Sequence, residues 1–141
     1  MNTNTSAPKW TTPGTVSARA SIWVIVGYCL WQGAGIIIGG AIRWSGPAYT
    51  FLRQAPGAPA SWGWAIITGG LLLGTASLMT NWWLKLIALV SIVSWSLGFA
   101  YGAQYATLTV PVAGTTGGPV YVAFAFLAAI LVLPDEARKA I

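Results

Sequence analysis

Four long runs of apolar residues, separated by polar or turn-forming segments, dominate this chain. Residues 22–42 and 62–80 contain no charged side chain, and residues 82–104 contain only Lys85, one turn inside the start of that run. A bilayer core about 30 Å thick needs around 20 apolar helical residues to cross it. The pattern therefore predicts three transmembrane helices over these ranges.

The fourth run, residues 119–133, is shorter than the others. Its 15 residues give about 22 Å of helix at a rise of 1.5 Å per residue. A transmembrane helix here must begin earlier, stand untilted or thin the bilayer locally. We expect this helix as well, so the predicted fold is an all-α membrane protein with four transmembrane helices.

Two short tails flank the predicted transmembrane domain, which covers residues 22–133. Residues 1–21 are polar and rich in Thr, Ser and Pro, which is typical of a flexible tail. Residues 134–141 form a short charged end. The run 22–42 is too long for a cleaved signal peptide and no clean Ala-x-Ala site follows it, so we expect an uncleaved first helix.

Two connections between the predicted helices carry structural signals. Thr80 and Asn81 leave room only for a tight antiparallel hairpin. The longer connection, residues 43–61, has turn signals at residues 45–47 and 56–59. Between these turns, residues 48–53 form an amphipathic stretch that could lie on the membrane surface.

The distribution of basic residues predicts the orientation. Four spans put both termini on one side, together with the start of the third helix. Arg43 and Arg53 lie on the opposite side. Because basic residues accumulate on the cytoplasmic side of membrane proteins, we expect both termini in the cytoplasm, with five of the seven basic residues: Lys9, Arg19, Lys85, Arg138 and Lys139.

Tryptophans agree with the predicted boundaries. An indole ring is half apolar and half polar, and it prefers the interface between bilayer and water. Trp31 and Trp95 fall near the middle of their spans, where we expect them to face lipid or to fill packing space. The tryptophans near predicted helix ends are Trp23, Trp44, Trp62, Trp64, Trp82 and Trp83.

Composition supports a membrane environment and excludes several classes of function. Apolar residues make up 56% of the chain and charged residues 6%, against about a quarter charged in ordinary globular proteins. Histidine is absent, and Asp135 and Glu136 are the only carboxylates. Most metal sites, catalytic triads and proton relays need those side chains, so we expect a protein that is not an enzyme and has no cofactor. The net charge of +5 forms no patch, and nucleic acid is not an expected partner.

Pairs of small residues four positions apart are the repeated feature inside the spans. Small residues at this spacing share one helix face and let two helix backbones approach closely. Glycine is common in membrane helices, so some pairs among 17 glycines arise by chance. We expect at least two pairs to be helix-packing interfaces, within one chain or between chains. The pairs are Gly35 with Gly39, Gly70 with Gly74, and Gly98 with Gly102.

Gln32 is the one amide deep in a predicted span. Its carboxamide is costly in hydrocarbon unless it is hydrogen-bonded. We favour a bond between two helices of one chain over a role in a pore or an oligomer. Cys29, one turn earlier, is expected to pack as a small apolar residue. The candidate partners of Gln32 are Thr68, Ser77, Ser91, Ser94 and a second copy of Gln32.

The segment from Arg43 to Gly63, with its Arg-Trp-Ser-Gly-Pro and Pro-Gly-Ala-Pro stretches, resembles small four-span membrane proteins of actinobacterial tailed phages. The resemblance extends to the order of the spans and to the Gly-Thr-Thr-Gly-Gly-Pro stretch at residues 114–119. Some members of that group are labelled holins or holin-like. The resemblance implies no particular functional residue.

Two functional hypotheses follow. One is a holin-like protein that self-associates in the inner membrane of the host bacterium and permeabilises it during lysis. The other is a non-enzymatic accessory or scaffolding subunit of a larger membrane complex. In both, the partners are the lipid bilayer and other protein chains. A transporter is less favoured, because the spans hold no ionisable group beyond Lys85 near one end.

Overall fold

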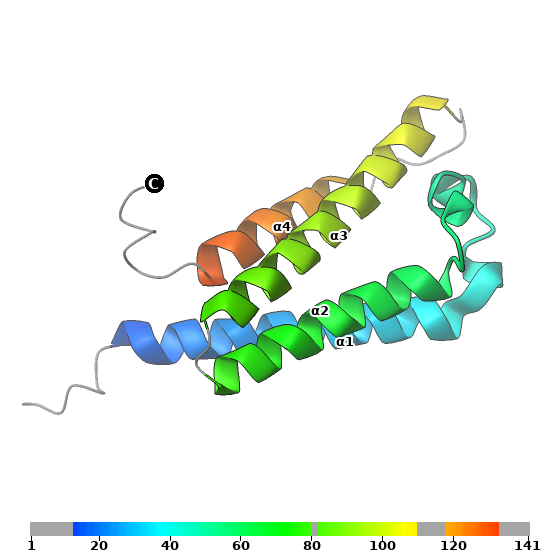
Figure 1. Cartoon of the computed structure of the whole chain (residues 1–141). Coiled ribbons are helices and arrows are strands. Elements are labelled where there is room, and N and C mark those ends of the chain that lie inside the picture. Colours follow the sequence, from blue (N-terminus) through cyan, green and yellow to red (C-terminus); the bar gives the residue numbers. More distant parts are fainter. Residues whose placement is uncertain (1–12, 80–81, 110–117, 133–141) are drawn as a thin grey trace, which may run out of the picture.

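The chain is all-helical in the computed structural model, which describes residues 13–79, 82–109 and 118–132 (Figure 1). No strand occurs in these ranges. The predicted C-terminal tail, residues 134–141, lies outside the described residues. The helices are α1 (Pro13–Arg43), α2 (Ala60–Leu78), α3 (Trp82–Thr109) and α4 (Gly118–Val132), with the short 3-10 helices η2 (Pro47–Tyr49) and η3 (Leu52–Gln54) between α1 and α2.

Two helices extend beyond their predicted ends. α1 begins at Pro13, so residues 13–21 are helical and the predicted flexible tail was too long. Proline is favourable at the first position of a helix, and the alanines that follow are strong helix formers. α3 continues to Thr109, five residues past the predicted end at Gln104.

α1 changes direction near its C-terminal end. Gly40 has φ 53° and ψ −163° inside the helix, a conformation that glycine adopts at little steric cost. The kink turns the last residues of α1 away from the axis of the main helix. It thereby directs the chain into the segment that holds η2 and η3.

The helices form two antiparallel pairs. α1 packs along α2, and α3 packs along α4, while α2 and α3 join the two pairs (Figure 1). α1 and α4 make the fewest contacts among these helix pairs. The seam between α1 and α4 is therefore the least closed side of the molecule.

α1 and α2 touch through their backbones. A Cβ atom added to Gly33 would lie 2.6 Å from the carbonyl oxygen of Gly63, and one added to Gly63 would lie 2.8 Å from the carbonyl oxygen of Gly33. Further along, a Cβ on Gly70 would lie 2.7 Å from the Cβ of Cys29, which is fully buried. Because these distances leave no room for a side chain, glycine sets how closely the two helices approach.

The segment between α1 and α2 packs on α3. Leu52 in η3 is 1% exposed, and a Cβ on Gly102 would lie 2.6 Å from its side chain. The indole nitrogen of Trp62 donates a hydrogen bond of 3.0 Å to the carbonyl oxygen of Leu52. Within the predicted amphipathic stretch, residues 48–53, the side chain of Leu52 therefore packs on the glycine face of α3.

The outer faces of the helices are apolar. Two segments, Ala20–Ile42 and Trp83–Ala106, are long and apolar enough to cross a membrane. Only 28% and 44% of their apolar windows are buried inside the molecule, so most of this apolar surface points outward. The most exposed large apolar side chains, each at least 71% exposed, are Val24, Trp31, Ile38, Ile42, Leu78, Trp83 and Leu108.

The contact between Gly33 and Gly63 can be tested by adding one methyl group. We expect Gly33→Ala to lower the stability of the protein in detergent micelles by about 1–3 kcal/mol, as overpacking does elsewhere. Gly27→Ala is the matched control, because a Cβ there meets nothing within 4 Å and the gain in helix propensity is the same. Thermal unfolding followed by circular dichroism measures both. Equal melting temperatures for the two variants would contradict the close contact.

Candidate functional site

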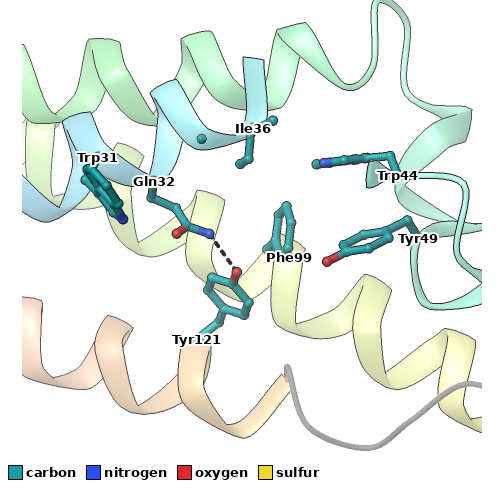
Figure 2. Close-up of a pocket in the computed structure, with 8 residues that line it drawn as sticks. Trp31, Gln32, Ile36, Trp44, Tyr49, Phe99 and Tyr121 are labelled. Carbon is teal, nitrogen blue, oxygen red and sulfur yellow. Dashed lines mark hydrogen bonds between the residues drawn. The ribbon is translucent and has the colours of Figure 1, made fainter. Parts of the chain in front are cut away.

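A cavity of about 300 Å³ lies between α1, α3, α4 and the segment that holds η2 (Figure 2). Cavities of this size are at the lower end of the range for small-molecule sites, roughly 300–1,000 Å³. None of the side chains around it is charged. The cavity is lined by Trp31, Gln32, Gly35, Ile36, Trp44, Tyr49, Phe99 and Tyr121.

Helix periodicity and the Gly40 kink bring these residues together. Gln32 and Ile36 are one turn apart and so lie on the same face of α1. Trp44 and Tyr49 follow the kink and close one end of the cavity, and Figure 2 shows both side chains reaching toward Phe99 of α3.

Gln32 bonds to a partner that the sequence did not indicate. Its carboxamide nitrogen donates a hydrogen bond of 2.8 Å to the hydroxyl oxygen of Tyr121 in α4 (Figure 2). The bond joins two helices of one chain, which is the type of interaction the sequence favoured. It spans the weakly packed seam between α1 and α4.

The expected hydroxyl partners are engaged elsewhere or face outward. Ser77 and Ser91 donate to the carbonyl oxygens of Leu73 and Ile87, one turn back in their own helices. Such bonds are common for Ser in helices and remove the hydroxyl as a donor to another helix. Thr68 and Ser94 are exposed on the outer surface.

Aromatic rings form most of the cavity wall. Trp44 and Tyr49 stack with centroids 5.0 Å apart, and Phe99 lies 4.7 Å from Tyr121. Behind Phe99, Trp95 stacks on its ring at 4.8 Å. Trp95 is 5% exposed and fills packing space, as expected, whereas Trp31 is 80% exposed at the cavity rim.

Trp95 and Trp62 hold the wall through their indole nitrogens. Trp95 donates a hydrogen bond of 2.8 Å to the carbonyl oxygen of Trp62. Trp62 in turn donates to Leu52, as described above. Because α2, α3 and η3 are linked in this way, the rings behind the cavity are fixed in place.

The three glycine pairs take different positions. Gly70 and Gly74 both face α1, with Cys29 and Val26 as neighbours, and Gly98 and Gly102 face Trp62 and Leu52. Gly35 lines the cavity, and a Cβ there would meet nothing within 4 Å; Gly39 is partly exposed.

The closest glycine contacts involve two residues that the sequence analysis did not single out, Gly33 and Gly63. A signal for Gly33 was present in the sequence. Cys29 is a small residue four positions earlier, and both residues face α2. Counting cysteine among the small residues would have found this face. Gly63 has no such partner four positions away, so spacing alone gave no signal for it.

A second, apolar pocket of about 420 Å³ lies along the same seam between α1 and α4. The rings of Tyr28 and Phe124 meet beside it, with centroids 4.3 Å apart. The described ranges contain no cluster of side chains that could hold a metal ion. The first cavity, with its neutral donors, one carboxamide and aromatic rings, has a lining suited to binding a ligand.

No protein family model, curated protein or solved structure matches this chain. Its function is therefore inferred from the composition of the chain and the geometry of its helices.

The bond between Gln32 and Tyr121 can be tested by substitution. We expect Gln32→Leu to lower stability in micelles by about 1 kcal/mol, because a hydrogen bond between helices is lost and replaced by apolar contact. Gln104→Leu is the control, since Gln104 is exposed on α3. Unfolding curves in a denaturing detergent measure the difference. A loss as large for Gln104→Leu would show that the bond contributes nothing specific.

Proposed function

We propose that this chain is an integral membrane protein with four spans and both termini in the cytoplasm. The observation that carries the proposal is the apolar outer surface of the helices, where side chains such as Trp31, Ile38 and Leu108 are more than three-quarters exposed. Water does not favour such a surface on a folded chain, whereas hydrocarbon does.

The two shorter helices are consistent with this proposal. α2 has 19 residues and no charged side chain, and its packing against both α1 and α3 places it beside the two long apolar helices. α4 has 15 apolar residues and runs alongside α3. A helix of this length fits a locally thinned bilayer or a short span without tilt.

The proposed activity is holin-like. The protein inserts into the inner membrane of a host bacterium, self-associates and permeabilises that membrane during lysis, without acting as an enzyme. This activity needs stable insertion and lateral association. The apolar exterior supports the first, and the face of α1 that includes Gly35 supports the second, because a Cβ at Gly35 would meet nothing within 4 Å in its own chain.

An accessory or scaffolding subunit of a larger membrane complex is the second candidate. One observation favours it: the glycine pairs of α2 and α3 are occupied by contacts within the chain. Fewer small-residue faces are then available for a second copy. The exposed rings of Trp31, Trp64 and Trp83 would in that case contact a partner protein as well as lipid.

Reporter fusions test the topology. We expect a reporter inserted at Gly57 to lie outside the cytoplasm and one fused after Ile141 to lie inside it. The reason is that an even number of spans separates the two termini and one span precedes Gly57. Paired phosphatase and fluorescent-protein fusions in a bacterium measure the two locations. If both reporters give the same side, the four-span proposal fails.

Crosslinking in intact membranes tests self-association. We expect Gly35→Leu with Gly39→Leu to reduce crosslinked oligomers and any loss of membrane potential on expression, while the amount of inserted protein stays the same. Gly70→Leu with Gly74→Leu is the contrasting variant. It should lower protein abundance, because a side chain at Gly70 collides with Cys29 inside the chain.

The wild-type protein provides the decisive comparison. Oligomers and a collapse of membrane potential on induction support the holin-like activity. A protein that never crosslinks beyond the monomer, and leaves growth and potential unchanged at high expression, rejects it. Copurification of a different protein in mild detergent would then support the accessory subunit.

A further inference from the structure

The polar atoms that face the cavity are mostly hydrogen-bond donors. Tyr121 accepts a hydrogen bond from Gln32, so its own hydroxyl proton is directed to another acceptor. Figure 2 shows the hydroxyl of Tyr49 and the indole nitrogen of Trp44 inside the same space. No buried side-chain nitrogen or oxygen among the described residues lacks a hydrogen-bond partner, so these groups are available to a ligand where the cavity exposes them.

The cavity also contains one hydrogen-bond acceptor. The carboxamide oxygen of Gln32 accepts no hydrogen bond from a described residue, and Gln32 lines the cavity. A ligand that fills the cavity buries these donors, so it has to bring acceptor atoms, since a donor that becomes buried without a partner is costly. Carbonyl oxygens meet this requirement.

The residues that line the cavity indicate the shape and the charge of the ligand. The rings of Trp44, Tyr49, Phe99 and Tyr121 surround the space, and aromatic walls favour a flat ring that can stack against them. No lining side chain is charged. A charged ligand would lose its hydration without a counter-charge, so the ligand is neutral.

Access is from the outer surface of the helices. Trp31 is 80% exposed at the rim of the cavity, beside the apolar exterior described above. A ligand that reaches the cavity across this rim is itself soluble in an apolar phase. We propose that the cavity binds a flat, neutral ring with carbonyl oxygens, the chemistry of a quinone head group. The proposal rests on the cavity and its lining, and not on the holin-like activity.

Isothermal titration tests the proposal on the full-length protein in maltoside micelles, with menadione as the probe and empty micelles as the blank. We expect saturable binding with one site per chain. Tyr121→Phe removes one donor and keeps the ring, so it should weaken binding about fivefold to tenfold. Tyr105→Phe is the control, because Tyr105 is exposed on α3 outside the cavity and should leave the affinity unchanged.

A second pair of variants tests the location. A Cβ at Gly35 meets nothing within 4 Å, and the space beyond it is the cavity, so Gly35→Leu should fill the site and abolish binding. Gly27→Leu adds the same side chain to the same helix, where a Cβ also meets nothing within 4 Å, and it should bind as the wild type does. Circular dichroism spectra and melting temperatures close to those of the wild type show that the variants remain folded.

Three results would overturn the proposal. The first is a wild-type protein that gives no saturable heat. The second is unchanged affinity in both Gly35→Leu and Tyr121→Phe. The third is binding in micelles that disappears in phospholipid nanodiscs, because lipid ester carbonyls would then be the occupants. None of these results depends on whether the chain permeabilises membranes.

Discussion

The backbone contact between Gly33 and Gly63 determines how α1 is rotated in the structure. Glycine is required at both positions because the carbonyl oxygen of each lies where the other would carry a Cβ. Successive helical residues are about 100° apart around the axis. With Gly33 held against α2, the neighbouring residue Gln32 must point toward a different helix, and it meets Tyr121 of α4. Ile36, one turn on from Gln32, then lies on the same side, at the cavity.

The interior and exterior of this molecule differ in an unusual way. Large apolar side chains such as Ile38 are exposed, whereas the closest contacts between helices are made at glycines and Cys29. Polar groups inside are satisfied by the protein itself: the hydroxyl of Ser96 bonds to the carbonyl oxygen of Ile92. Hydrocarbon provides no hydrogen bonds, so internal satisfaction is the condition for placing such groups in a bilayer.

The sequence predicted the helices better than it predicted their contacts. A run of apolar residues is a local signal, and the cores of α2, α3 and α4 were found from it. The helices are apolar on nearly every side, so the pattern gave little information about which face meets which helix. The contact partner of Gln32 could not be derived, because Tyr121 is 89 positions away and depends on the register of α4. The kink at Gly40 was equally hidden among other glycines, since only the backbone conformation distinguishes it.

Gly35 connects the two properties proposed for this chain. At Gly33 and Gly70 the packing leaves no space for a side chain. At Gly35, in contrast, a Cβ would meet nothing within 4 Å, so a larger residue would fit there without strain. Helix propensity also favours a larger residue there. The glycine therefore preserves either the volume of the cavity or a close approach by another chain. Because both uses require the same face of α1, a ring bound near Gly35 and a neighbouring helix packed on it would exclude each other. Ligand binding and self-association are then expected to be coupled with opposite sign.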